Sequence, residues 1–230
     1  MKPIIGVVGR VVESEGKTIV MSFEGVRRSI IKHGGIPYLI LPNQDLDYLS
    51  ETPSKLPKLT DSEKEDLKRI IDLCDGIVMP GTNYLFEYDE FIYKYAFDKE
   101  LPILGICGGM QLMSLCDINE EEQTLTLIES NINHKQPDAQ YVHKVTIDEE
   151  SLLYKIVGEK EINVNSRHRY CINGVKDMKV CGMSEDGYIE AIEYRDKNFV
   201  IGVQWHPEIM CDFDEPSNKI FEYFIKACKE

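Results

Sequence analysis

The chain has 230 residues, 43% of them hydrophobic, and a formal net charge of −14 at pH 7. This length allows one domain with a substantial core, and the apolar fraction argues against disorder. The negative charge argues against nucleic acid and anionic membrane surfaces as partners, because proteins that bind them concentrate Lys and Arg. No apolar run approaches the ~20 residues that span a bilayer. The N-terminal MKPIIGVVGR is typical of a first strand rather than of a signal peptide.

Cysteine usage bears on the compartment and on metals. The seven cysteines are an odd number and contain no C-x-x-C motif, so we expect free thiols and a cytoplasmic protein. Neither H-E-x-x-H nor a cysteine pair with zinc-ligand spacing occurs, and the glycine-rich phosphate loops of ATP- and NAD-binding proteins are missing. The sequence therefore predicts no metal site and no organic cofactor.

The first half of the chain alternates between two patterns. Short apolar runs, typical of buried parallel strands, lie at 3–9, 36–42, 76–81 and 102–107. Segments with the apolar spacing of helices lie at 23–35, 60–76 and 90–100. The second segment opens with Thr60 three residues before Glu63, which is the spacing of a capping box. The alternation predicts an α/β fold, with a mostly parallel central sheet and helices on both faces.

The second half consists mainly of short strands. They are expected at 143–147, 161–166, 179–184, 188–194 and 198–205, with turn-like residues between them. One short helix is expected at 151–158, and an amphipathic helix at 215–230 should pack back on the sheet. This pattern predicts an antiparallel extension of the sheet. The chain shows no internal repeat and no low-complexity linker.

One cysteine stands in a motif. Residues 105–109 read G-I-C-G-G, the thiol counterpart of the G-x-S-x-G nucleophile elbow between a strand and a helix. The N-terminus of the following helix would favour the thiolate of Cys107, and the N–H of Gly108 would face a developing oxyanion. The motif alone fits a buried structural cysteine equally well, so a base must decide between the two readings.

His206 is the best candidate for that base. It follows an apolar strand, at the end of which α/β sheets place catalytic groups, and Glu208 two residues later is suited to orient its ring. Considered without the elbow, His206 would be read as a solvent-facing turn residue. The remaining histidines, which lie in loops or at element ends, are His33, His134, His143 and His168.

At this point the residues resemble a known family. GICGGMQ at 105–111 and GVQWHPE at 202–208 resemble the class I glutamine amidotransferase superfamily, which carries a Cys-His-Glu triad in that order. Within it, the chain resembles the γ-glutamyl-γ-aminobutyrate hydrolase group, the peptidase C26 type, nearly from end to end. The resemblance implies a flavodoxin-like α/β fold and a single glutamine amidotransferase-like catalytic domain over residues 1–230.

The resemblance also implies roles for individual residues. Cys107 would be the nucleophile, His206 the base and then the acid, and Glu208 the group that orients His206. Gly81 and Gly108 would supply backbone donors to the oxyanion.

The implied substrate-binding residues are Gln111, Ser166 and His168. A helix-forming glutamine and a hydrogen-bonded turn remain the structural alternatives for these positions. Arg167 and Arg169 lie near the expected pocket, where one of them could neutralise a glutamyl carboxylate, or both could be solvated loop charges.

Two departures from the hydrolase group concern the pocket. Gly108 stands where that group usually has arginine, and Thr82 stands where it usually has a second glycine. Each position keeps a backbone N–H, so the oxyanion site need not be lost. The departures bear on the identity of the substrate more than on the reaction.

The expected function is cysteine-dependent hydrolysis of γ-glutamyl amide bonds through a γ-glutamyl thioester, on a γ-glutamyl-γ-aminobutyrate-type substrate or glutamine. The products would be glutamate and an amine, and the partner a small γ-glutamyl molecule. Two alternatives stay open: a glutaminase subunit that supplies ammonia to a separate synthetase, and a catalytically silent γ-glutamyl-binding protein. The sequence leaves a homo-oligomer open as well.

Overall fold

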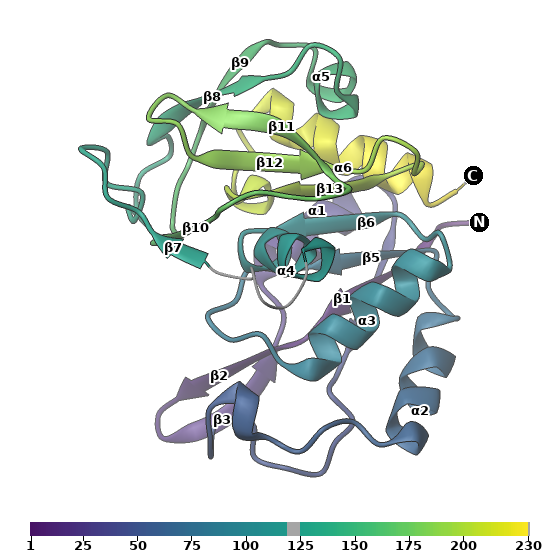
Figure 1. The fold of residues 1–230 in the computed structure, drawn as a ribbon. Helices are drawn as coiled ribbons and strands as arrows, with labels where there is room; N and C mark the ends of the chain where they lie inside the picture. Colours follow the sequence, from purple (N-terminus) through teal and green to yellow (C-terminus); the bar gives the residue numbers. More distant parts are fainter. Residues whose placement is uncertain (119–124, 230) are drawn as a thin grey trace.

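The computed structural model describes residues 1–118 and 125–229. Its main feature is a nine-stranded sheet (Figure 1). In spatial order the strands are β4 (Ile36–Ile40), β1 (Ile4–Val8), β5 (Gly76–Met79), β6 (Ile103–Ile106), β13 (Val200–Val203), β12 (Ile189–Glu193), β11 (Lys179–Ser184), β8 (His143–Ile147) and β9 (Glu161–Val164). Every strand that the sequence predicted belongs to this sheet.

The pairing changes direction within the sheet. Neighbouring strands from β4 to β13 run parallel, and those from β13 to β9 run antiparallel. The predicted parallel sheet with an antiparallel extension is therefore confirmed. Parallel neighbours need long crossover connections, which the helices of the first half supply, whereas short turns suffice for antiparallel neighbours.

Helices cover both faces of the sheet, as predicted. One face packs against α2 (Asp61–Ile71), α3 (Glu87–Asp98) and α4 (Gly108–Asp117), and the other against α1 (Glu24–Lys32), α5 (Leu152–Val157) and α6 (Glu215–Ala227). In Figure 1, α3 and α4 lie in front of the sheet and α6 lies behind it. Along β5, Ile77 and Met79 join the core under α3, while Val78 joins the core on the other face. This alternation is the two-residue period of a strand.

Two helix starts show how local sequence sets the boundaries. The predicted capping box is present, since the Glu63 N–H donates to Thr60 Oγ1 and the Thr60 N–H donates to the Glu63 carboxylate. Helix α3 begins at Glu87 rather than at the expected position 90. The Asp89 carboxylate accepts the Phe86 N–H at 2.9 Å, which satisfies a backbone donor at the helix start.

The sequence did not predict two small antiparallel ribbons. One is the hairpin of β2 (Arg10–Ser14) and β3 (Lys17–Met21), and the other pairs β7 (Leu125–Leu127) with β10 (Tyr170–Ile172). Glu15 and Gly16, at the tip of the hairpin, have φ values of 52° and 71°, as a two-residue type I′ turn requires. Short 3₁₀ turns form at η1 (Pro53–Lys55) and η3 (Pro207–Ile209). The hairpin follows β1 directly and places its first residues beside the candidate site.

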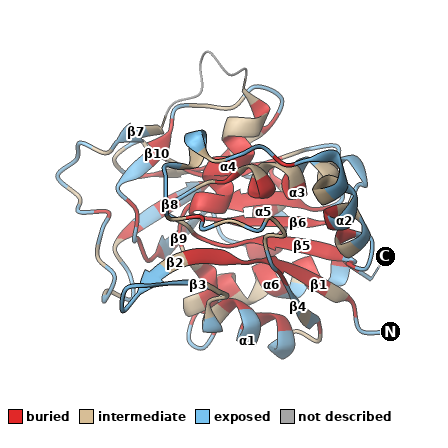
Figure 2. Ribbon diagram, turned by 90° about the horizontal axis from the view of Figure 1, so that it is seen from below, coloured by how far each residue is buried: buried red, intermediate tan, exposed pale blue. Residues whose placement is uncertain are grey.

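Burial is greatest in the central strands. Figure 2 shows β5 and β6 entirely buried, and the outer end of the β2–β3 hairpin exposed. All seven cysteines are free thiols. Among the described residues, no helix combines the length and apolar character needed to cross a membrane.

Candidate active site

Cys107 lies at the corner between β6 and α4. Its backbone has φ 51° and ψ −108°, a conformation that residues other than glycine rarely adopt. The structure holds it there from both sides: the Cys107 N–H donates to the Val203 carbonyl at 2.8 Å, and the Cys107 carbonyl accepts from Gln111 N–H at 3.0 Å. A Cβ added to Gly109 would lie 2.0 Å from the Met79 carbonyl oxygen, so only glycine fits the turn. Such local strain is typical of a nucleophile elbow.

His206 follows β13, the strand that pairs with β6. Its Nδ1 lies 2.7 Å from Glu208 Oε1, and Glu208 is buried in η3. Asn165 holds the histidine backbone: its side-chain amide donates to the His206 carbonyl at 2.8 Å and its oxygen accepts the His206 N–H at 2.9 Å. The bond to Glu208 places the proton on Nδ1 and leaves Nε2 to face the thiol.

The electrostatics of this pair favour charge separation. Burial raises the pKa of Cys107, but the charge of His206 and its hydrogen bond to the thiol outweigh burial, so the pKa is lowered overall. Burial lowers the pKa of His206, but the charges of Glu208 and Cys107 outweigh it, so that pKa is raised. Both shifts favour a thiolate beside an imidazolium, which is the reactive form of a cysteine nucleophile.

The two expected oxyanion donors lie close to Cys107, one in the loop after β5 and one at the start of α4. A Cβ added to Gly81 would lie 2.9 Å from His206 Cε1 and 3.5 Å from Cys107 Cβ, which places Gly81 against both residues. Gly108 is the first residue of α4, where backbone N–H groups have no partner within the helix. Thr82 Oγ1 accepts the Tyr84 N–H at 3.1 Å and so shapes the loop that follows Gly81.

A pocket of about 560 Å³ opens over Cys107. Its lining comes from β2, the loop after β5, the ends of β6 and β13, and one residue each before α1, after β4 and after β9. The lining residues are Arg10, Val11, Val12, Glu13, Phe23, Leu49, Gly81, Thr82, Asn83, Tyr84, Cys107, Arg167 and His206. Arg10 is buried, bonded to the Asp89 carboxylate and, at 2.7 Å, to the Pro80 carbonyl. Arg167 is exposed and donates to the Pro137 carbonyl at 2.5 Å. Two cations therefore line the pocket above the thiol.

The other expected binding residues do not line this pocket. Gln111 is nearly buried, and its amide donates to the Tyr170 carbonyl at 3.0 Å and to Gln204 Oε1 at 3.2 Å. Ser166 and His168 are buried behind Arg167, and Arg169 lines a separate depression with His168. A role for these residues in binding substrate stays a prediction.

Sequence reasoning missed two contributors, Arg10 and Asn165. A signal was present for Arg10, because a charged residue two positions after a buried strand lies near the carboxyl end of the sheet. No local pattern distinguishes Asn165, since its partner His206 is 41 residues away.

Comparison with relatives identifies the family of the chain, and comparison with solved structures identifies its fold. The Peptidase C26 family model matches residues 87–208, more than half of the chain. A glutamine amidotransferase-like protein of Rickettsia prowazekii is 29% identical, with 99% of this chain and 98% of that protein covered. CTP synthase of Thermotoga maritima is 29% identical, with 74% of this chain matching 38% of the synthase. The chain belongs to the Peptidase C26 family, within the class I glutamine amidotransferase superfamily.

The fold is also that of known glutaminase domains. The glutaminase domain of Trypanosoma brucei CTPS with bound acivicin superposes with a TM-score of 0.65 at 18% identity, over 99% of this chain and 94% of that one. At this identity the likeness concerns the fold, a class I glutamine amidotransferase fold of the flavodoxin-like type.

Proposed function

We propose that the chain is a cysteine-dependent hydrolase of γ-glutamyl amide bonds, with residues 1–230 acting as one catalytic domain in the cytoplasm. The observation that carries the proposal is the line from Glu208 through His206 to Cys107, on an elbow with a strained backbone. This arrangement supports nucleophilic catalysis by a thiolate, because the base and its orienting carboxylate are already in place. Family membership supports the same reaction class.

The proposed reaction has two halves. The Cys107 thiolate attacks the γ-carbonyl carbon, and the backbone N–H groups of Gly81 and Gly108 stabilise the resulting oxyanion, each worth about 10²–10³ in rate. The oxyanion collapses, the C–N bond breaks, and the His206 imidazolium protonates the departing amine. Neutral His206 then takes a proton from water, the hydroxide attacks the thioester, and the C–S bond breaks to release glutamate and restore the thiolate.

Recognition of the glutamyl group is proposed for cations and polar groups around the thiol. Arg167 is suited to the α-carboxylate, because it lines the pocket and, unlike Arg10, has no carboxylate partner among the described residues. Gln111, Ser166 and His168 do not line the pocket, so their proposed part in recognition is to support its wall rather than to contact the glutamyl group. The amine half of the substrate would lie toward the β2–β3 hairpin, whose Val11 and Val12 also line the pocket.

The test uses both labelling and turnover. We expect acivicin to add once to the purified chain, on Cys107, and we expect glutamate release from γ-glutamyl-γ-aminobutyrate or glutamine. Cys107→Ala should abolish both, whereas the control Cys116→Ala, a partly exposed thiol outside the pocket, should leave both unchanged. Labelling that spreads equally over the other thiols would contradict the assignment of the nucleophile.

A second candidate is a glutaminase subunit that passes ammonia to a separate synthetase. It is favoured by the match of this chain to 38% of Thermotoga maritima CTP synthase. Activity of the purified chain without any partner separates the two: a free-standing hydrolase releases glutamate alone, whereas a subunit does so only when its synthetase is added. A silent binding protein would bind γ-glutamyl compounds but would neither turn them over nor be labelled.

A further inference from the structure

Three histidines and one glutamate meet in the antiparallel half of the sheet, outside the lining of the Cys107 pocket. This His₃Glu cluster consists of His134 in the loop between β7 and β8, His143 at the start of β8, His168 between β9 and β10, and Glu190 in β12. One ligand atom from each residue lies within 4.8 Å of all the others. Each residue is at most 5% exposed.

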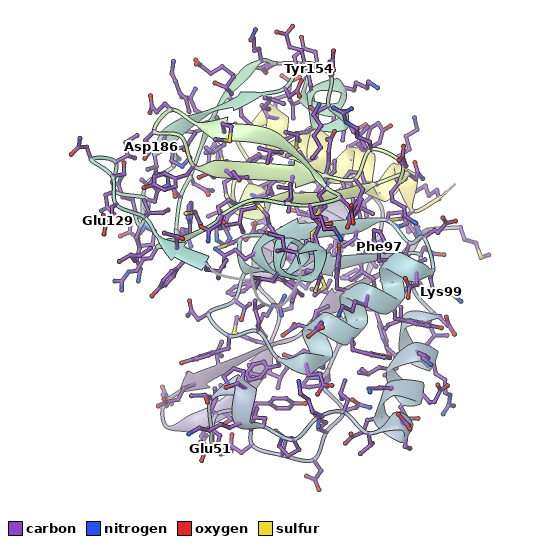
Figure 3. All side chains as sticks on the ribbon, viewed as in Figure 1. Glu51, Phe97, Lys99, Glu129, Tyr154 and Asp186 are labelled. Carbon is purple, nitrogen blue, oxygen red and sulfur yellow. The ribbon has the colours of Figure 1, made fainter. Side chains whose placement is uncertain are left out.

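The outer nitrogen of each ring lies against an oxygen that can only accept a hydrogen bond. Two of these oxygens are backbone carbonyls, and the third belongs to a carboxylate, which is an acceptor only when ionised. The contacts are His134 Nε2 to the Asp186 carboxylate at 2.9 Å, His143 Nδ1 to the Lys144 carbonyl at 3.2 Å, and His168 Nδ1 to the Tyr170 carbonyl at 3.1 Å. Asp186, labelled in Figure 3, lies in the turn between β11 and β12. The outer nitrogens must therefore carry the ring protons, and in a neutral ring the inner nitrogen presents a lone pair.

The inner atoms then face one another as acceptors. Glu190 Oε1 lies 3.7 Å from His134 Nδ1, 3.6 Å from His143 Nε2 and 3.4 Å from His168 Nε2. The described residues offer no well-aligned hydrogen bond to either Glu190 carboxylate oxygen, to His143 Nε2 or to His168 Nε2. Among these inner atoms, only His134 Nδ1 has a possible hydrogen-bond donor, the Ser166 hydroxyl at 3.4 Å. Buried acceptors without a donor are costly, and a bound cation removes that cost.

We propose that the His₃Glu cluster binds one divalent transition-metal ion, of which Zn²⁺ is the probe of choice. Tetrahedral zinc with bonds of about 2.0–2.1 Å holds its ligand atoms about 3.3–3.4 Å apart. The three nitrogen–oxygen distances of 3.4–3.7 Å are close to that value, and the ligand atoms of the cluster, all within 4.8 Å of one another, must draw together as the ion binds. Imidazole and carboxylate ligands suit Zn²⁺, Co²⁺ and Ni²⁺. The carbonyl and carboxylate partners of the outer nitrogens orient the rings as they do in known metal sites.

Four protein ligands leave no open position, so the ion is structural rather than catalytic. It joins β8 and β12 to two loops, and one of these loops reaches the active site. In that loop Asn165 bonds both backbone groups of His206, and Arg167 lines the pocket over Cys107. Loss of the ion therefore loosens the segment that positions the proposed base. The proposal does not depend on the reaction, because a metal can hold this loop whatever the pocket binds.

The experiment titrates metal into the purified full-length chain after treatment with a chelator and removal of it. We expect uptake of one Co²⁺ per chain, with the visible d–d bands of tetrahedral cobalt, and displacement of that Co²⁺ by Zn²⁺. Zinc at 100 times its Kd should raise Tm by about 5–10 °C. A folded chain that takes up neither metal stoichiometrically overturns the proposal and leaves a network of shared protons instead.

Variants locate the site. Glu190→Gln and His143→Gln should each lower the affinity for Zn²⁺ by at least about 100-fold, as judged from mutations in known metal sites. The matched control is His33→Gln, a histidine at the end of α1 outside the cluster, which should bind Zn²⁺ as the unaltered chain does. If the cluster variants do not fold, the cobalt spectrum of the unaltered chain tests the proposal. Tetrahedral bands would support it, and octahedral bands would overturn it, because they would mean that the ion binds outside the cluster. Unchanged affinity in folded Glu190→Gln likewise overturns the assignment.

Discussion

A Cβ added to Gly108 would lie 2.7 Å from the carbonyl oxygen of Thr82 and 2.8 Å from its amide nitrogen. The first residue of α4 therefore rests directly on the loop that follows β5. At both of these positions the chain departs from the hydrolase group that it resembles, and the contact couples the two departures. An arginine at position 108 has no room unless the loop with Thr82 moves away.

This contact predicts that Gly108→Ala and Gly108→Arg impair the enzyme. Displacing the loop also moves Gly81, the proposed oxyanion donor, and loss of one such donor costs about 10²–10³ in kcat. Overpacking should reduce the free energy of unfolding by about 1–3 kcal/mol. Steady-state glutamate release and urea unfolding measure the two effects. Gly174→Ala, where a Cβ meets open space, is the control; full activity in Gly108→Arg would contradict the coupling.

The lowered pKa of Cys107 predicts that this thiol reacts with iodoacetamide at neutral pH. Burial raises this pKa, but the lowering by His206 is larger. The thiolate therefore persists below the ordinary cysteine pKa of about 8.5. In contrast, burial raises the pKa of Cys74 to about 11 and of Cys116 to about 12. We expect Cys107 to be alkylated rapidly at neutral pH and the other two slowly, as measured by peptide mass spectrometry. The idea fails if all three rates rise together above pH 8.

The raised pKa of His206 predicts the alkaline limb of the pH–rate profile. The imidazolium persists above the ordinary histidine pKa, and kcat/KM falls only as the pH rises through the raised value. Glu208 is the largest contributor that raises this pKa, so Glu208→Gln should move the alkaline limb to lower pH as well as reduce the rate. Glu222→Gln on the exposed face of α6 serves as the control. An unmoved limb would show that Glu208 does not act through His206.

Two nearby arginines give a matched test of substrate binding. Arg167 lines the pocket over Cys107, whereas Arg169 lines a different depression. Arg167→Met should raise KM for γ-glutamyl substrates about 10-fold or more, because a hydrogen bond to a charged group is worth about 1.5–3 kcal/mol. The rise should be smaller for a substrate whose α-carboxylate is an amide. Arg169→Met should have little effect, and equal effects of both changes would remove the assignment.

The buried ion pair of Arg10 and Asp89 predicts a large loss of stability. Both side chains are at most 1% exposed, and Asp89 also accepts the Phe86 N–H at the start of α3. Asp89→Asn leaves the Arg10 charge buried without its counter-charge, which typically costs about 3–5 kcal/mol. Urea unfolding measures the loss. Asp66→Asn, on the exposed side of α2, should change stability by less than about 1 kcal/mol.

Much of the fold could be predicted because local patterns encode it. The runs that became β5 and β6 are apolar at every position, since both faces of a parallel strand are buried. The β2–β3 hairpin was not predicted, because β3 is exposed or half-buried throughout and its apolar run covers only residues 19–21. The site shows the same division. The motifs G-I-C-G-G and W-H-P-E could be recognised in the sequence, whereas Arg10 and Asn165 belong to the site only through contacts with distant segments.

The sequence by itself determined the chain order of the helices and of the strands of the main sheet, the elbow at Cys107, and the pairing of His206 with Glu208 two residues later. These depend on neighbours along the chain, which periodicity and short motifs record. Only the tertiary structure decided which residues share the pocket, and only it gathered the His₃Glu cluster from positions 134, 143, 168 and 190. Those contacts depend on which strands pair and where loops fold back, and side-chain spacing along the chain does not encode either.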